Sequence, residues 1–131
     1  MSSFWKAFLI AAVGASVANL IVLTILRPMV VDPAMPLGSL AIAPVVTLTV
    51  IGTIAAAVVY AVVRKLSSNP RKTFIWISIV ALVVSLIPDY AIKGMTTGHF
   101  AGATMGAVLT LMLMHVVAAL IVVWAFLRYW K

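Results

Sequence analysis

An apolar segment near the C-terminus constrains this chain more than any other feature. From residue 107 to residue 127 every side chain is apolar except Thr110 and His115, and the small residues before it extend the segment back to Phe100. The hydrocarbon core of a bilayer is ~30 Å thick, and an α-helix rising ~1.5 Å per residue crosses it in about 20 residues. The segment therefore predicts a transmembrane helix over residues 100–127.

Three further apolar segments, residues 5–26, 40–63 and 71–88, are also long enough to cross a bilayer. Hydrophobic residues make up 66% of the chain and charged residues 8%. That is more apolar surface than a soluble domain of this length can bury. The sequence thus predicts an all-α fold, a four-helix transmembrane bundle embedded in the lipid bilayer, which forms a single domain over residues 1–131.

Prolines and capping residues indicate where the helices begin and end. A proline disfavours helical geometry in the residue before it, so we expect the first helix to end at Pro28 and the third to break or bend at Pro88. Asn69 is placed to cap the third helix, with Pro70 at the first helical position, where the missing N–H is not needed. Ser39 is placed to cap the second helix.

Basic residues are distributed unevenly between the two sides of the predicted bundle. The N-terminal side, the loop between the second and third segments and the C-terminal side hold no acidic residue and carry Lys6, Arg64, Lys65, Arg71, Lys72, Arg128 and Lys131. The other two loops balance Arg27 and Lys93 against Asp32 and Asp89. Because cytoplasmic loops carry an excess of Lys and Arg, we expect both the N-terminus and the C-terminus to be cytoplasmic.

The composition also excludes several classes of function. A formal charge of +7 would suggest nucleic-acid binding in a soluble protein, but here the basic residues flank membrane segments, so we expect no nucleic-acid partner. The chain has no cysteine and therefore no disulfide or thiolate metal site. No acidic residue lies inside a predicted span, which argues against a proton-coupled exporter of the small multidrug type. No nucleotide-binding loop, HExxH motif or Ser/His/Asp set is recognisable, so we predict no enzyme and no catalytic residue.

His115 is the only ionisable residue deep inside a predicted span, where such a group is costly and marks a candidate functional site. It lies roughly 18 Å from the cytoplasmic end of its helix, and the same count places Asn19, Thr49 and Ser85 at roughly 18–21 Å. Four helices thus offer hydrogen-bonding groups at one depth. Either a neutral His115 bonds to Asn19 or a hydroxyl and fixes helix register, or the four residues bind a lipid-soluble ligand such as haem or a quinone.

Cofactor and metal sites receive little support. A six-coordinate membrane haem needs two facing imidazoles, and His99 and His115 lie roughly 24 Å apart along one predicted helix. Met105, Met112 and Met114 suggest Cu(I), which prefers soft thioether ligands. Their helical spacing puts Met114 on a different face from the other two, so we interpret all three as packing residues. We predict no cofactor and no metal site.

Small residues at four-residue spacing predict close helix packing. Gly98, Gly102 and Gly106 form such a series in the fourth segment, and Gly14 and Gly52, each with an alanine four residues later, offer matching surfaces on the first two. Glycine at these positions lets helix backbones approach closely. We interpret the series as packing within the chain, with homodimerisation through the fourth segment as the alternative.

Three short motifs in the second half resemble a known family. They are residues 71–74 (Arg-Lys-Thr-Phe), residues 79–88 (ending in Ser-Leu-Ile-Pro) and residues 113–119 (containing a Met-His pair). They resemble a domain-of-unknown-function family, family 6069, of small four-span bacterial membrane proteins, over about residues 64–127. The resemblance implies a multi-pass protein of the bacterial cytoplasmic (plasma) membrane, draws attention to Ser85, Pro88 and His115, and supplies no activity.

Three functional hypotheses remain open at this point. The first is a small membrane protein that acts as an accessory subunit of a larger complex or binds an apolar ligand around His115. The second is a small-solute transporter or channel component. It would have to be oligomeric, because four helices around this polar layer leave little room for an aqueous path. The third is a membrane enzyme with His115 as acid or base, for which the sequence offers no partner carboxylate.

Overall fold

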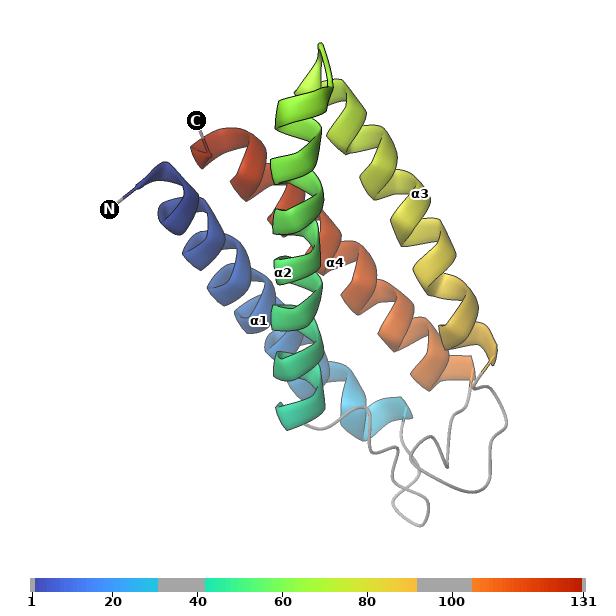
Figure 1. The fold of residues 1–131 in the computed structure, drawn as a ribbon. Coiled ribbons are helices and arrows are strands. Elements are labelled where there is room, and N and C mark those ends of the chain that lie inside the picture. The colour runs from blue at the N-terminus through green and yellow to red at the C-terminus, as the bar shows by residue number, and fades with distance from the viewer. Residues whose placement is uncertain (1, 31–41, 92–104, 131) are drawn as a thin grey trace.

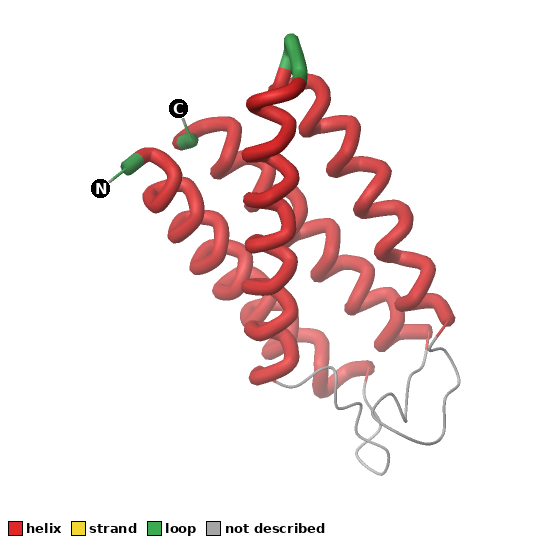
Figure 2. The backbone as a smooth tube through the Cα atoms, viewed as in Figure 1, coloured by secondary structure: helices red, strands yellow, loops and turns green. Residues whose placement is uncertain are grey.

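A computed structural model describes residues 2–30, 42–91 and 105–130 of the chain. These residues form four α-helices, α1 (Ser3–Val30), α2 (Ile42–Leu66), α3 (Pro70–Ala91) and α4 (Met105–Tyr129) (Figures 1 and 2). Each helix is long and apolar enough to cross a membrane. The all-helical, four-span architecture predicted from the sequence is therefore confirmed for the part of the chain that the structure describes.

The helices form an antiparallel bundle that is packed unevenly. Both termini and the turn between α2 and α3 lie at one end of the bundle (Figure 1). We call this the basic end, because its described residues include Lys6, Arg64, Lys65, Arg71, Lys72 and Arg128. Helix α1 packs most extensively against α4, whereas α2 and α3 make few contacts with each other. These two helices start together at their connecting turn and spread apart toward the opposite end (Figure 1).

Two helices continue past the prolines that were expected to interrupt them. Helix α1 ends at Val30, two residues after Pro28, and α3 ends at Ala91, three residues after Pro88. Each proline lies in the last turn of its helix, where it removes only the one backbone hydrogen bond that its own N–H would have made. Each helix therefore extends only two or three residues past its proline.

The start of α3 matches its sequence signal. The Asn69 side-chain oxygen accepts a hydrogen bond from the backbone N–H of Lys72 at 3.3 Å, and the Asn69 carbonyl accepts one from the N–H of Thr73 at 3.1 Å. Pro70 is the first residue of the helix. The predicted Asn69 cap is confirmed, whereas Ser39, the predicted cap of the second helix, lies outside the described residues.

The larger of two apolar core clusters fills the basic end. Ala7, Ala11 and Ala15 of α1 are fully buried there. They pack in one cluster with aromatic rings of the other three helices, Tyr60, Phe74 and Phe126. Small side chains at four-residue spacing let the α1 backbone lie close to its neighbours. A Cβ atom at Gly14 would lie 3.3 Å from Cγ2 of Ile121 on α4, so Gly14 contributes to this close packing as predicted.

Aromatic rings at the basic end also pack against the guanidinium group of Arg64. The Tyr60 and Phe74 ring centroids lie 4.5 Å apart, and Trp130 contacts Tyr60 edge-on at 5.1 Å. The Arg64 guanidinium lies 5.8 Å from the Tyr60 centroid and 5.4 Å from that of Trp130. Both distances fall within the range of cation–π attraction. These contacts tie the end of α4 to α2.

A second, smaller cluster, consisting of Leu23, Val45, Val108 and Met114, lies nearer the opposite end of the bundle. The two clusters are separated along the helices by residues that include buried polar side chains. Asn19, Thr49 and Thr53 belong to this intermediate level. The bundle is therefore apolar at both core clusters and polar in between, which is where the candidate site lies.

Candidate functional site

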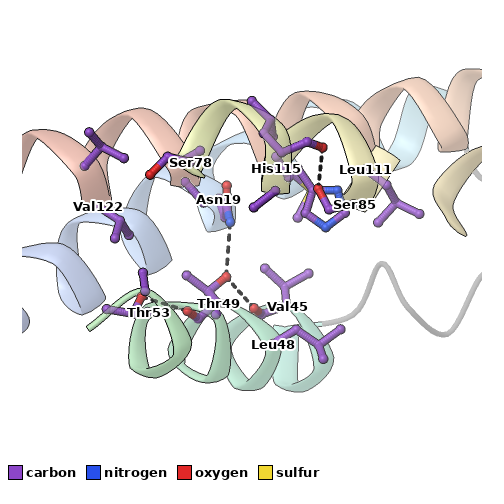
Figure 3. Close-up of a pocket in the computed structure, with 18 residues that line it drawn as sticks. Asn19, Val45, Leu48, Thr49, Thr53, Ser78, Ser85, Leu111, His115 and Val122 are labelled. Carbon is purple, nitrogen blue, oxygen red and sulfur yellow. Dashed lines mark hydrogen bonds between the residues drawn. The ribbon is translucent and has the colours of Figure 1, made fainter. Parts of the chain in front are cut away.

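A cavity of about 430 Å³ lies between α2, α3 and α4, with Asn19 of α1 contributing to its wall (Figure 3). Its lining is mostly apolar, with Val45, Leu111 and Met114 among the larger side chains. Leu48, Gly52 and Ala81 line it as well and are exposed on the outside of the bundle. The cavity therefore opens laterally between α2 and α3, which make few contacts with each other.

The four residues predicted to form a polar layer all line this cavity. Asn19, Thr49, Ser85 and His115 come from α1, α2, α3 and α4 in that order. Counting residues along each helix predicted a common depth, and the bundle brings the four side chains to one site. Thr49 and His115 come from different walls, the first from α2 and the second from α4 (Figure 3).

Asn19 and Thr49 are joined directly. The Asn19 Nδ2 donates a hydrogen bond to the Thr49 Oγ1 at 3.1 Å, and the Thr49 hydroxyl donates its proton to the Val45 carbonyl at 2.6 Å. Asn19 is only 4% exposed. A hydroxyl has a single proton, so Thr49 accepts from Asn19 and fixes the orientation of the amide. Among the described residues, the Asn19 Oδ1 is buried and accepts no hydrogen bond.

His115 is half-buried in the α4 wall of the cavity. The sequence left open whether it pairs with Asn19. In the structure one N–H of the Asn19 amide bonds to Thr49, which joins α1 to α2. None of the lining residues carries a carboxylate or an ammonium group. Among the described residues, the polar side chains of this lining are hydroxyl groups, one amide and one imidazole.

Two polar lining residues were missed from the sequence. Thr53 is 1% exposed and donates its hydroxyl proton to the Thr49 carbonyl at 2.8 Å, and Ser78 donates to the Phe74 carbonyl at 2.7 Å. Thr53 follows Thr49 by four residues and Ser78 precedes Ser85 by seven, and both spacings keep side chains on one helix face. A test for a shared face, in addition to a shared depth, would have found them.

One packing prediction is corrected. Gly52 was expected to let a neighbouring helix approach, but a Cβ atom there would have nothing within 4 Å. Gly52 and Ala56 line the cavity instead. The small side chains on this face of α2 widen the opening toward α3 and do not close a helix contact.

The remaining predicted residues lie elsewhere. Gly98, His99 and Gly102 are outside the described residues. Gly106 is in the first turn of α4, where its carbonyl accepts a hydrogen bond from the Thr110 hydroxyl at 2.9 Å. Of the three methionines, Met114 is buried and lines the cavity. Among the described residues, no group of three His, Cys, Asp or Glu side chains is placed to hold a metal ion.

Four antiparallel membrane-spanning helices around a laterally open cavity define the class of this chain, a small multi-pass integral membrane protein. The chain belongs to a family of unknown function, DUF6069, whose model matches residues 1–131. The match extends the resemblance of the second half of the chain to the first. No curated protein and no solved structure is significantly similar to the chain.

Proposed function

We propose that this membrane protein binds a small, largely apolar molecule that enters its cavity from the lipid phase. The observation that carries the proposal is the cavity itself, about 430 Å³ in volume, lined by apolar side chains and a few polar ones. Sites for small molecules are typically ~300–1,000 Å³, mostly apolar, with a small number of placed polar groups. The size and lining of this cavity match that description.

The position of the opening supports access from the membrane. Leu48 is 63% exposed, and Gly52 and Ala81 beside the cavity are exposed too. All three belong to transmembrane helices, whose exposed surfaces face lipid. A ligand that dissolves in the bilayer therefore reaches the polar layer without crossing water.

The wall of the cavity also includes a residue with a polar atom that the fold leaves unpaired in an apolar surrounding. An unpaired polar group in the hydrocarbon region is costly because no water is present to bond it. The Asn19 Oδ1 is such a group among the described residues. A ligand with an apolar body and one polar group fits both parts of the cavity.

The proposal is tested by asking what the protein retains when it is purified. The wild type, Gly52→Phe and Val58→Phe are purified in mild detergent and extracted with organic solvent, and the extracts are compared by mass spectrometry. The first substitution places a ring at the cavity opening, where a new Cβ meets nothing within 4 Å. The second adds the same ring at a position that is 60% exposed and does not line the cavity.

We expect a small molecule in near-stoichiometric amount in the wild type and Val58→Phe, and at least tenfold less of it in Gly52→Phe. Identical extracts from all three proteins, containing only bulk phospholipid, would contradict the proposal.

A further inference from the structure

The hydroxyl groups that line the cavity share one property: each has already used its proton. Thr53 donates to the carbonyl of Thr49, Ser78 to that of Phe74 and Ser85 to that of Leu82, at 2.7–2.8 Å. Thr49 donates to Val45 at 2.6 Å. A hydroxyl has one proton and two lone pairs. The hydrogen-bonding capacity that remains on these four lining side chains is therefore that of acceptors.

The Asn19 side chain adds another oxygen atom that can only accept a hydrogen bond. Because the Thr49 proton is committed to Val45, Thr49 receives an N–H from Asn19. The amide oxygen of Asn19 is then directed away from Thr49, buried, and without a donor among the described residues. The Asn19 amide nitrogen keeps one further N–H, against the side-chain oxygens of Asn19, Thr49, Thr53, Ser78 and Ser85, which can only accept.

We propose that the molecule bound in this cavity is a neutral hydrogen-bond donor, an apolar alcohol, phenol or amide, whose O–H or N–H is directed at the Asn19–Thr49 pair. This inference rests on the proposed function and specifies the chemistry of its ligand. An acceptor wall is complemented by a donor, and leaving a buried acceptor unpaired loses affinity. A ketone, ether or quinone meets this wall with another acceptor.

The donor is neutral because the cavity holds no group that would balance a charge. No lining residue is acidic, and an ammonium ion in the hydrocarbon region without a partner is costly. Organic amines in their charged form are therefore excluded, although they are also donors. The class that remains combines an apolar body with an uncharged O–H or N–H.

A matched pair of probes tests this inference. We would measure equilibrium binding of 2-naphthol and 2-methoxynaphthalene to the purified protein in lipid nanodiscs, with empty nanodiscs to correct for partition into lipid. The two probes share an aromatic body and differ in the O–H donor. The wild type, Gly52→Phe and Asn19→Leu are compared, the last replacing the amide by an apolar side chain of similar size.

We expect the wild type to bind 2-naphthol saturably and at least tenfold more tightly than 2-methoxynaphthalene. Gly52→Phe should bind neither probe. In Asn19→Leu the affinities for the two probes should differ by no more than twofold. Should Asn19→Leu fail to fold, the wild-type comparison still decides. If the wild type bound both probes equally tightly and Gly52→Phe bound neither, the cavity would still be a binding site, but the inference of a donor ligand would be overturned. Absence of saturable binding for both probes would overturn the proposed function and the inference with it.

Discussion

At the scale of single residues, the Asn19–Thr49 hydrogen bond is the contact that joins α1 to α2 in the polar layer. The bond is 3.1 Å long and both side chains are buried. Hydrogen bonds between membrane helices contribute about 0.6–2 kcal/mol each. The Asn19–Thr49 hydrogen bond therefore makes a moderate contribution to the stability of the bundle. It also orients the Asn19 amide, so that the nitrogen faces Thr49 and the oxygen does not.

Thr49→Val should destabilise the protein by about 0.6–2 kcal/mol, because it removes the acceptor of the Asn19 amide at nearly constant volume. Thr47→Val is the matched control, since Thr47 is exposed on the outside of α2 and does not line the cavity. Reversible unfolding in mixed detergent measures both variants. Equal stability of the two variants would show that the Asn19–Thr49 bond carries no net energy.

All four predicted polar residues line the cavity, whereas Thr53, Ser78 and the place of Gly52 in its lining were not predicted. The constant helical rise is enough to place Asn19, Thr49 and His115 at one level. Which side chains face the cavity depends also on the rotation of each helix about its axis, which packing sets. Thr53 and Ser78 were missed for that reason, and Gly52 was assigned to a helix contact that the structure does not contain.

At the scale of elements, local sequence signals gave the helices and missed some of their ends. Asn69 and Pro70 start α3 as capping chemistry predicts. Pro28 and Pro88 lie inside the last turns of α1 and α3. Each proline removes one backbone hydrogen bond, and the helices continue for two or three residues beyond it. The lateral opening depends on the divergence of α2 from α3, which no local pattern encodes.

The turn between α2 and α3 offers a direct test of orientation. Arg64, Lys65, Arg71 and Lys72 flank this turn, and we propose that the basic end faces the cytoplasm, as the distribution of Lys and Arg favours. The chain has no cysteine, so a single introduced thiol is labelled without background. A membrane-impermeant maleimide should react with Ser68→Cys only after the cells are opened.

Ser39→Cys is the matched control, because the sequence places residue 39 between the first two spans, on the other side of the membrane from residue 68. In intact cells it should react with the same reagent. The reverse labelling pattern would contradict the proposed orientation.

At the scale of the whole molecule, the bundle is built in three levels. A tight aromatic and alanine core fills the basic end, a smaller apolar cluster lies toward the opposite end, and the cavity with its polar layer lies between them. The tight core joins all four helices at one end, which lets α2 and α3 separate further along without loss of the bundle.

The measurement that tests the central claim most directly is a methyl NMR titration of the nanodisc-embedded protein, labelled at alanine and methionine methyl groups, with 2-naphthol. Ala56, Ala118 and Met114 line the cavity, whereas Ala7 and Ala11 are buried in the core of the basic end. We predict saturable shifts at the three cavity residues, with Ala7 and Ala11 unmoved. Shifts spread evenly over lipid-facing and core methyl groups, or none that saturate, would contradict a ligand site between α2 and α3.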